Sequence, residues 1–494
     1  MDNSSPSSMN SNMNTIDDID TPNSLDDSQA STSRESVELD QAVIRQDFED
    51  GLRLDLNLGV AAYPVFLTSK PAALLARYLE GLIGCQTAER QALRLNSPKH
   101  IILLCDENTA ELFGIEVETQ LITAGWKVDA LTVPAGEGAK TLATAEQICE
   151  ALAALGATRD TVLCSLGGGI ISDLAGFVAG IYKRGMHLAH ISTSLVGLVD
   201  ASVGGKTAVN LPTGKNLIGL YKHPLAIVSD PYFVQQLSEE DYVCGLAEAA
   251  KTAILAGEEF TAWMEQSADA LLQRDPDTLR ELIARCISFK ASIVATDPTE
   301  DNEPSARLSL NYGHTLGHVI ETVTAHYAAL AEHSETLDAT THATVPAAIP
   351  HGVAIAQGMR FEARIAMQFV EASADFVLRQ DALLDALRLP ALDSSIMGED
   401  LSLIAETFYR DKKVTDNDLR FILLANPGAP EIVTVPREAL LDHLRAWLNM
   451  PLKKSSASIV GADSEVQNEV QSEPQSEARK NELPTKSAKQ ENEL

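Results

Sequence analysis

The sequence predicts a protein in two parts, an α/β half followed by an all-helical half. Apolar strands alternate with amphipathic helices up to about Ser238, and longer helical patterns follow. Both ends are polar and poor in apolar residues, which is typical of disorder. With 494 residues, 45% of them hydrophobic, the chain is long enough for two domains with substantial cores. We expect disordered tails at 1–51 and 453–494, an α/β domain at 52–237 and a helical domain at 238–452.

The first half alternates two kinds of pattern. The predicted strands are LRLDLNLG, HIILLCD, WKVDALTV and DTVLCSL. The predicted helices between them are PAALLARYLEGLIG and TLATAEQICEALAALG, which place apolar residues on one helical face. Strands and helices in this order predict a mainly parallel sheet with helices packed against it.

The second half has helical periodicity in five segments. These are DYVCGLAEAAKTAILAG, DTLRELIARCISFKASIVA, HTLGHVIETVTAHYAALAEH, GVAIAQGMRFEARIAMQFVEA and REALLDHLRAWLN. A cleft between an α/β domain and a helical domain is a common place for a ligand.

Charge and cysteine content narrow the class of protein. The net charge of −32 argues against nucleic acid or an anionic membrane as a partner, so an anionic ligand would need a local basic cluster. The six cysteines form no CxxC pair and most lie in apolar runs, which indicates reduced thiols. The sequence contains no membrane-length apolar run and no signal-peptide pattern, so we expect a cytoplasmic protein.

A glycine-rich segment, TSLVGLVDASVGGKTAVNLPTGKN, places four polar side chains among glycines. They are Asp200, Lys206, Lys215 and Asn216. Glycines let backbone N–H groups approach an oxyanion while a lysine supplies charge, so we expect a loop that binds phosphate. A solvated surface loop would have the same composition.

A second glycine motif, LGGGIISDLAGF, follows a predicted strand. Gly167, Gly168 and Gly169 would lie where the strand turns into a helix, a position that suits a pyrophosphate. The motif is not GxGxxG, and a turn selected for packing is the alternative.

The helix GLAEAAKTAIL carries a carboxylate and an ammonium on one face. Glu248 and Lys251 are three residues apart, and their neighbours are small or apolar. Charged groups on a buried helix need partners such as a metal or an anion. An exposed ion pair is the alternative.

Two histidines follow in RLSLNYGHTLGHVIE. His314 and His318 are four residues apart on one helical face, and Arg307 and Asn311 precede them on the same side. HxxxH without an intervening glutamate is a moderate zinc signal, and one core and one surface histidine would give the same spacing.

His351, just before an apolar helix, completes a possible metal set. Alone it would be a capping or packing residue. With Glu248 and His314 it forms the combination of two histidines and one carboxylate that suits a catalytic Zn²⁺.

Together these segments resemble the 3-dehydroquinate synthase family over roughly residues 54–450. The motifs that carry the resemblance are GGGIISDLAGFVAGIYKRG, VDASVGGKTAVNLPTGKNLIG, GLAEAAK, NYGHTLGHVIE, HGVAIAQGM and RDKKVTDNDLRFILL, in the family's order. The resemblance implies an N-terminal NAD-binding α/β domain and a C-terminal all-α metal-binding domain with the site between them.

The resemblance also implies roles for individual residues. Zn²⁺ or Co²⁺ would be held by Glu248, His314 and His351. NAD would be contacted by Asp106, Asn108, Glu137, Lys140, Gly168, Gly169, Ile170, Asp173, Thr193, Ser194, Asp200, Lys206, Lys215 and Phe233.

The remaining implied residues face the substrate. The phosphate would be bound by Lys206, Asn216, one of Lys412 and Lys413, and Arg184 from the neighbouring subunit of a homodimer. The carboxylate would face Lys290, Arg307 and Asn311. Lys251 and His318 would contact hydroxyls, with His318 as the proton relay and Asp200 beside them.

The implied reaction converts 3-deoxy-D-arabino-heptulosonate 7-phosphate to 3-dehydroquinate and phosphate, in the shikimate pathway of aromatic amino acid biosynthesis. Another NAD- and metal-dependent sugar-phosphate cyclase is the first alternative. A metal-dependent alcohol or glycerol dehydrogenase and a non-catalytic scaffold are the others, and the dense lysine set argues against both. Departures from the family pattern at Ser172, Ser192, Gln236 and Val353 affect local cofactor contacts and no proposed metal ligand.

Overall fold

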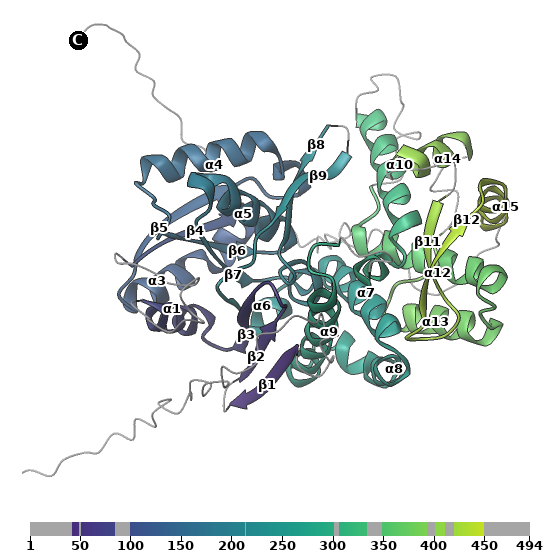
Figure 1. Cartoon of the computed structure of the whole chain (residues 1–494), viewed down its shortest axis with the longest axis horizontal. Coiled ribbons are helices and arrows are strands. Elements are labelled where there is room, and N and C mark those ends of the chain that lie inside the picture. Colours follow the sequence, from purple (N-terminus) through teal and green to yellow (C-terminus); the bar gives the residue numbers. More distant parts are fainter. Residues whose placement is uncertain are drawn as a thin grey trace, which may run out of the picture.

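The two predicted parts lie side by side in the computed structural model (Figure 1). The structure describes residues 42–48, 51–83, 99–212, 214–300, 306–332, 348–392, 401–410 and 419–448. Within these ranges no helix is long and apolar enough to cross a membrane.

An eight-stranded sheet forms the α/β half, with the order β1-β2-β3-β10-β7-β6-β4-β5. The strands β1 to β3 pair antiparallel, and the pairs from β3 to β5 along this order are parallel. The strands are β1 (Val43–Phe48), β2 (Gly51–Asn57), β3 (Ala62–Thr68), β4 (His100–Asp106), β5 (Lys127–Val133), β6 (Val162–Gly167), β7 (His187–Ser192) and β10 (Ile227–Ser229).

Helices cover both faces of this sheet, as the alternation of strands and helices predicts. Ile101 and Leu103 of β4 pack with α1 and α3, whereas Ile102 and Leu104 pack with α4 and α5. Successive side chains of a strand point to opposite faces, so a strand covered on both sides is apolar throughout. The helices and short turns of this half are α1 (Pro71–Leu82), α2 (Glu107–Thr109), η3 (Ala110–Gly114), α3 (Ile115–Thr123), η4 (Glu137–Ala139), α4 (Leu142–Ala154), α5 (Gly169–Ile181), η5 (Tyr182–Arg184), η6 (Gly197–Ala201) and α6 (Pro231–Gln235).

The folded part begins earlier than the expected boundary at residue 52. Strand β1 pairs with β2 from Val43↔Leu56 to Phe48↔Gly51, and Arg45 Nη1 lies 2.7 Å from Glu281 Oε2 of α9. An edge strand with mostly exposed side chains needs few apolar residues, so VIRQDF has the composition of a polar tail.

The glycine-rich segment is also more regular than the loop we expected. After η6 it forms an antiparallel hairpin of β8 (Lys206–Leu211) and β9 (Gly214–Tyr221). The hairpin packs on α5 because two glycines leave room for it. A Cβ on Gly176 would lie 2.2 Å from Thr207 Cγ2, and one on Gly180 would lie 2.4 Å from Leu220 Cδ1.

The second half is helical, as predicted, and it carries one two-stranded sheet among its helices. It contains the antiparallel hairpin of β11 (Leu419–Leu424) and β12 (Pro430–Val435), which packs on α12. A six-residue apolar run such as LRFILL has no periodicity that separates strand from helix. The helices are α7 (Glu239–Ala256), α8 (Glu258–Leu272), α9 (Pro276–Thr296), η7 (Ala306–Asn311), α10 (His314–Glu332), α12 (His351–Phe369), α13 (Ala374–Ala386), α14 (Leu401–Arg410) and α15 (Arg437–Leu448).

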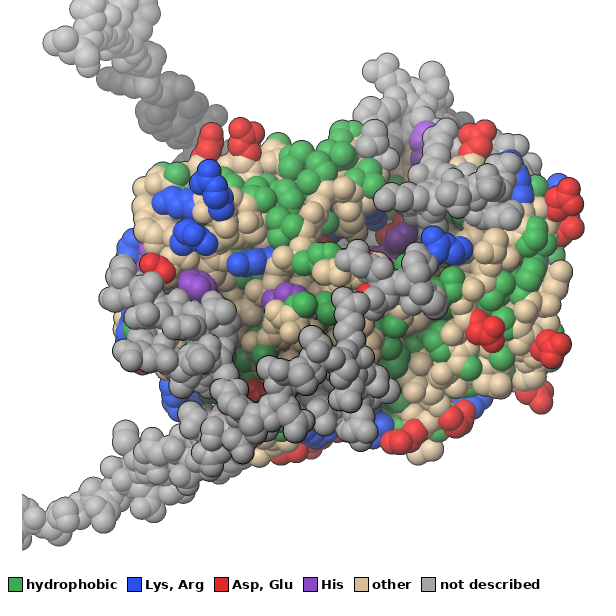
Figure 2. Space-filling view, in the orientation of Figure 1, with side chains coloured by type: hydrophobic (Ala, Val, Ile, Leu, Met, Phe, Trp, Pro, Cys, Tyr) green, Lys and Arg blue, Asp and Glu red, His purple; other side chains and the backbone are tan. Residues whose placement is uncertain are grey.

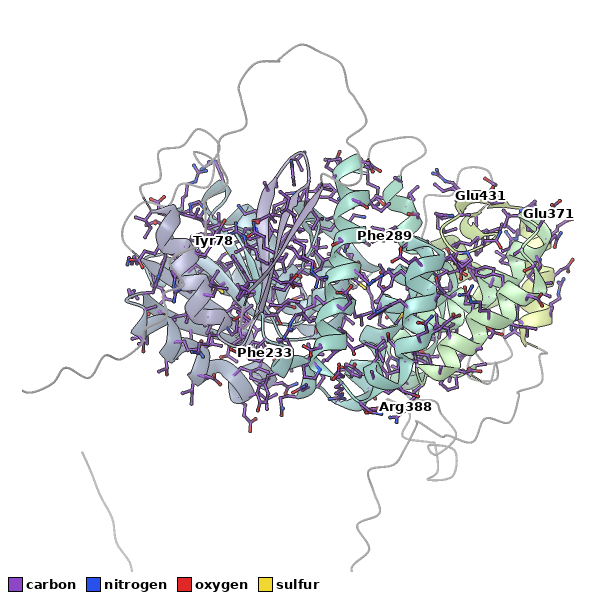
Figure 3. The ribbon with its side chains drawn as sticks, turned by 90° about the horizontal axis from the view of Figure 1, so that it is seen from below. Tyr78, Phe233, Phe289, Glu371, Arg388 and Glu431 are labelled. Carbon is purple, nitrogen blue, oxygen red and sulfur yellow. The ribbon has the colours of Figure 1, made fainter. Side chains whose placement is uncertain are left out.

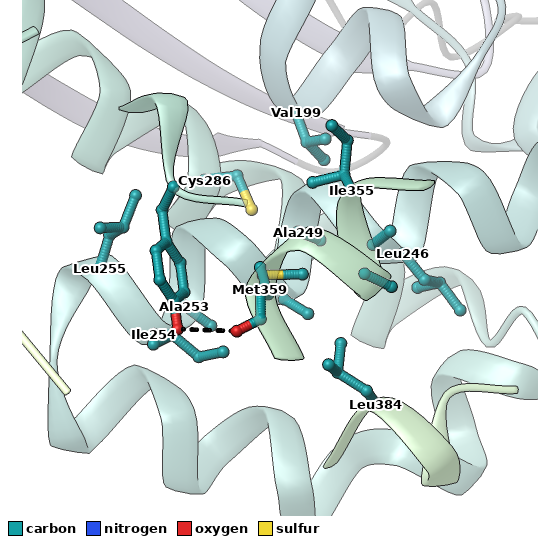
Figure 4. Packing of buried hydrophobic residues seen from close by; sticks show 14 of the residues in the cluster. Val199, Leu246, Ala249, Ala253, Ile254, Leu255, Cys286, Ile355, Met359 and Leu384 are labelled. Carbon is teal, nitrogen blue, oxygen red and sulfur yellow. Dashed lines mark hydrogen bonds between the residues drawn. The ribbon is translucent and has the colours of Figure 1, made fainter. Parts of the chain in front are cut away.

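One hydrophobic core joins the two halves. It contains Leu54 of β2 and Val199 of η6 together with residues of α7, α9, α10 and α12. Figure 4 shows Val199 beside Ile355 of α12, with side chains of α7 around them. Seen from below, Phe233 lies in the α/β half and Glu431 at the far end of the helical half (Figure 3). The helix α7 therefore has no exposed face through most of its length.

Candidate metal and cofactor site

Three side chains from separate helices meet between the halves. Glu248 lies in the middle of α7, and His314 and His351 are the first residues of α10 and α12. Glu248 Oε1 is 3.1 Å from His351 Nε2 and 3.7 Å from His314 Nε2, and the donor atoms of all three residues lie within 4.8 Å of one another. Figure 2 shows histidine and acidic side chains recessed between the halves.

Close glycine contacts hold the two histidine-bearing helices in place. A Cβ on Gly352 would lie 2.4 Å from Cys244 Cα, so the start of α12 packs directly on α7. A Cβ on Gly358 would lie 1.7 Å from Gly313 O, and Gly313 itself has a φ of 80°. Only glycine permits both the approach and the backbone conformation, so His314 and His351 are positioned by main chain packing.

Each histidine has a partner for its second ring nitrogen. His314 Nδ1 lies 3.2 Å from Tyr312 O, and His351 Nδ1 lies 3.3 Å from Glu321 Oε2. With Nδ1–H donated to these acceptors, both Nε2 atoms are directed at Glu248, and a bound cation would take the place of the proton that His351 Nε2 shares with Glu248. Two imidazole nitrogens and a carboxylate oxygen directed at one point fit a divalent cation such as Zn²⁺.

The charged side chains around the converging donor atoms shift one another's pKa. Lys251 Nζ lies 2.6 Å from Glu248 Oε2, and the two side chains are 2% and 1% exposed. Burial alone would raise the pKa of Glu248, but the Lys251 ammonium and the two histidines hold it well below the usual range. Burial would likewise lower the pKa of His351, but hydrogen bonds to Glu248 and Glu321 raise it to about 10. A positive charge is therefore stabilised at the point where the three donors meet.

A second buried ion pair lies beside the triad. Lys290 Nζ of α9 is 2.5 Å from Asp200 Oδ1 and 2.6 Å from Asp200 O of η6. Burial would raise the pKa of Asp200, but Lys290 and then Lys251 lower it to about 2. Burial lowers the pKa of Lys290. The structure thus brings four predicted catalytic or ligand residues into one cluster in which two carboxylates alternate with two ammonium groups: Glu248, Lys251, Asp200 and Lys290.

His318 extends this cluster by one helical turn. Its ring centroid lies 5.3 Å from that of His314 and 6.5 Å from that of His351. His318 therefore lies beside two of the three residues whose donor atoms converge.

Predicted cofactor residues form another connected group on the α/β half. Lys140 Nζ lies 2.5 Å from Asp173 Oδ2 of α5 and 2.6 Å from Asn216 Oδ1 of β9. Asn216 N donates to Asn210 Oδ1 at 2.9 Å, and Asn210 Nδ2 donates to Glu137 Oε1 at 2.6 Å. The hairpin and the start of α5 are therefore linked by polar side chains.

The glycine turn lies at the predicted place, between β6 and α5. A Cβ on Gly168 would lie 2.8 Å from Ser194 Oγ, and one on Gly169 would lie 3.1 Å from Ala201 Cβ. Thr193 N, just after β7, donates to Gly167 O at 3.0 Å, so the turn is joined to the end of β7 by this bond and to η6 by the approach of Gly169 to Ala201. The half-buried Ile170 follows in the first turn of α5, where N–H groups can bind an anion.

Other predicted cofactor residues have structural contacts of their own. Asp106 caps α2 by accepting from Thr109 N at 2.8 Å, and Asn108 is exposed on that helix. Phe233 is buried and packs on Phe113 with ring centroids 4.5 Å apart.

Several predicted substrate residues, and the predicted cofactor residue Lys215, have acidic or backbone partners in this structure. Lys206 Nζ lies 2.5 Å from Glu300 Oε2, and Lys215 Nζ lies 3.0 Å from Glu321 Oε1. Arg307 is buried and donates to Pro298 O at 2.5 Å and Gly204 O at 2.8 Å. Sequence reasoning did not foresee these backbone contacts of Arg307.

The remaining predicted substrate residues are dispersed or not described. Asn311 is half-buried at the end of η7, whereas Arg184 is exposed at the turn after α5, with a φ of 65°. Lys412 and Lys413 lie outside the described residues.

Sequence reasoning missed Glu321. It lies seven residues after His314 and three after His318 on α10, so helical spacing places it on the face that carries both histidines. No metal-ligand spacing identifies it, because it contacts a ligand and is not one of the three donors.

Two family sequence models together match more than half of the chain. The one described as 3-dehydroquinate synthase N-terminal matches residues 130–244, and the one described as 3-dehydroquinate synthase C-terminal matches residues 245–414. Their junction lies within α7, a few residues before Glu248.

Relatives and a solved structure agree with this match. The 3-dehydroquinate synthase of Rhodopirellula baltica is 30% identical, over 81% of this chain and 98% of that protein. The 3-dehydroquinate synthase of Haemophilus ducreyi is 35% identical, over 72% of this chain and 91% of that protein. The crystal structure of a 2-deoxy-scyllo-inosose synthase with carbaglucose-6-phosphate, NAD⁺ and Co²⁺ has the same fold, with a TM-score of 0.64 at 24% identity over 79% of this chain and 99% of that one. The chain belongs to the 3-dehydroquinate synthase family.

Proposed function

We propose that the protein is a 3-dehydroquinate synthase that converts 3-deoxy-D-arabino-heptulosonate 7-phosphate to 3-dehydroquinate and phosphate. The observation that carries the proposal is the convergence of Glu248, His314 and His351 beside the buried Lys251 and Lys290. This cluster joins a cation site to fixed ammonium groups, as a substrate with hydroxyls and a carboxylate requires.

NAD⁺ and a divalent metal ion would supply the redox chemistry. When bound, NAD⁺ takes up and returns one hydride while a divalent metal ion polarises the alcohol that is oxidised, so NADH does not accumulate. Glu248, His314 and His351 would hold the metal. The group of Lys140, Asp173 and Asn216, with the glycine turn, would hold the dinucleotide.

The protein's own residues would position the substrate and move protons. His318 accepts the hydroxyl proton and returns it when the carbonyl is reduced again. Lys251 and Lys290 lie in a water-poor cluster, so their charge acts on a bound anion with little screening. The departing phosphate would be held by Lys206 and Asn216 near the hairpin.

Finer features extend the proposal. Zn²⁺ is the expected metal because three protein ligands of this kind leave positions open for substrate, and Co²⁺ is expected to replace it. A homodimer would supply Arg184 to the neighbouring site, and its exposure on the α/β half supports this. The five cysteines within the described residues are free, four of them buried and Cys149 half-buried, and this supports a reducing compartment, the cytoplasm.

A phosphate-release assay tests the proposal. NAD⁺-loaded protein is given the heptulosonate phosphate with and without EDTA, and products and NADH are followed. We expect metal-dependent phosphate release and 3-dehydroquinate without net NADH. Turnover of sedoheptulose 7-phosphate or glucose 6-phosphate instead would make the protein a sister cyclase, and would mean that Arg307 serves its backbone contacts and not a carboxylate.

A further inference from the structure

Glu321 lies between the metal triad and the β8–β9 hairpin. Its two carboxylate oxygens have different partners. Oε2 lies 3.3 Å from His351 Nδ1, and Oε1 lies 3.0 Å from Lys215 Nζ. The Glu321 side chain is 9% exposed, whereas those of His351 and Lys215 are 39% and 52% exposed, so the carboxylate is the buried member of both contacts.

The contact with His351 orients a metal ligand. His351 is the first residue of α12 and its side chain is the most exposed of the three proposed ligands, so packing restrains its ring least. A carboxylate that accepts from Nδ1–H fixes the ring plane and leaves Nε2 directed at Glu248, 3.1 Å away.

The contact with Lys215 reaches the other half of the molecule. Lys215 lies on β9 next to Asn216, whose side chain contacts Lys140. Lys140 in turn contacts Asp173 at the start of α5. A continuous path of polar contacts, with one step along the main chain, therefore runs from His351 through Glu321 to the proposed dinucleotide site. Figure 1 shows the β8–β9 hairpin extending toward α10.

We propose that Glu321 is a positioning residue that holds His351 in its metal-binding orientation and, through Lys215, couples the metal centre to the hairpin of the nucleotide half. The inference rests on the proposed metal site. It assigns to Lys215 a link between the halves, in addition to any contact with cofactor.

Metal affinity is the direct test, because it does not require turnover. Metal-free protein is titrated with Co²⁺, and the visible absorption of the bound ion reports both affinity and geometry. Glu321→Ala is expected to weaken Co²⁺ binding about 10- to 100-fold and to alter the spectrum. Glu321→Gln keeps an acceptor oxygen for Nδ1–H but loses the charge, so its affinity should lie between those of wild type and Glu321→Ala.

A double-mutant cycle tests the coupling. Lys215→Met should weaken Co²⁺ binding about 2- to 5-fold in the wild-type background, because its pair with Glu321 is partly exposed. In the Glu321→Ala background the same change should have no effect, since the path is already broken. Glu431→Gln removes an exposed carboxylate at the far end of the helical half, so it serves as the charge-matched control for Glu321→Gln.

The outcomes separate this inference from the proposed function. Wild-type protein that binds no Co²⁺, or that binds it equally well after His314→Ala, would overturn the metal site itself. Wild-type binding that Glu321→Ala leaves unchanged would overturn only the role of Glu321. Additive effects of Lys215→Met and Glu321→Ala would overturn the coupling while leaving the orientation of His351 in place. Circular dichroism of each metal-free variant shows whether a loss of binding reflects unfolding, and Glu321→Gln then provides the folded test.

Discussion

The site combines two differently built regions. The metal triad of Glu248, His314 and His351 would hold a cation, whereas the β8–β9 hairpin carries lysines that could bind an anion. The triad lies on helices packed through Gly313, Gly352 and Gly358, where the main chain leaves almost no freedom. The lysines of the hairpin, Lys206 and Lys215, have side chains that are 48% and 52% exposed. Each is paired with a glutamate from the helical half.

The difference teaches how a strongly acidic protein can bind an anionic substrate. A buried cation site must be formed in advance, because a buried charge without a partner has a large desolvation cost. Exposed lysines can exchange a carboxylate for a phosphate at little cost, because surface ion pairs are weak. Three predictions, in order of expected effect, test this comparison.

The largest effect is expected from Glu248→Gln. The change removes a proposed metal ligand and leaves Lys251 buried, with Asp200 as the remaining carboxylate that raises its pKa. We expect loss of bound metal and activity, and destabilisation by about 3 kcal/mol, which is typical of breaking a buried ion pair. Metal analysis and denaturant unfolding of the metal-free protein measure the two losses. Unchanged stability would mean that Lys251 is neutral or is fully stabilised by Asp200.

Gly352→Ala should disturb the triad without changing any polar group. The added Cβ would meet the main chain of Cys244 at 2.4 Å, so the start of α12 must move and His351 with it. We expect weaker metal binding and a stability loss of about 1–3 kcal/mol, as for other overpacked sites. Calorimetric metal titration and thermal unfolding measure both. Gly81→Ala, in α1 with no atom within 4 Å of the new Cβ, is the matched control and should be neutral or slightly stabilising.

The smallest effects are expected at the exposed lysines. Lys206→Met should raise KM for the phosphorylated substrate about 10- to 100-fold, the range for a hydrogen bond to a charged group. Glu300→Gln removes the competing carboxylate and should lower KM about 2- to 5-fold. Steady-state kinetics measure both, with Lys127→Met, another exposed and paired lysine, as control. A higher KM in Glu300→Gln would show that Glu300 orients Lys206 and does not compete with substrate.

The sequence predicted the elements whose periodicity is long or whose faces are both covered. The β4 strand HIILLCD and the α7 helix are examples: the alternation of strands with helices identified the first, and the length of its pattern identified the second. Strand β1 escaped prediction because an edge strand exposes most of its side chains. The β11–β12 hairpin escaped it because short apolar runs lack a period.

The site divides in the same way. Spacing within one helix placed Glu248 with Lys251 and His314 with His318, and motif order suggested His351 as the third ligand. The role of Glu321 depends on a contact between α10 and α12 that no local spacing encodes. The backbone partners of Arg307 could not be predicted either, because Gly204 and Arg307 are brought together where η6 and η7 both pack on α9.

The core shared by the two halves sets a limit on how this protein can be divided. The helix α7 contacts η6, α8, α9, α12 and α13, and shares its hydrophobic core with β2, β3 and α10; it is also where the two family sequence models meet. A chain cut at that junction would leave either fragment with a wide apolar surface and no partner to cover it. A chimera that takes the α/β half from one enzyme and the helical half from another would therefore need an α7 whose side chains match that α/β half. The two halves match separate family models, but they share one hydrophobic core, so we expect them to unfold in one cooperative transition.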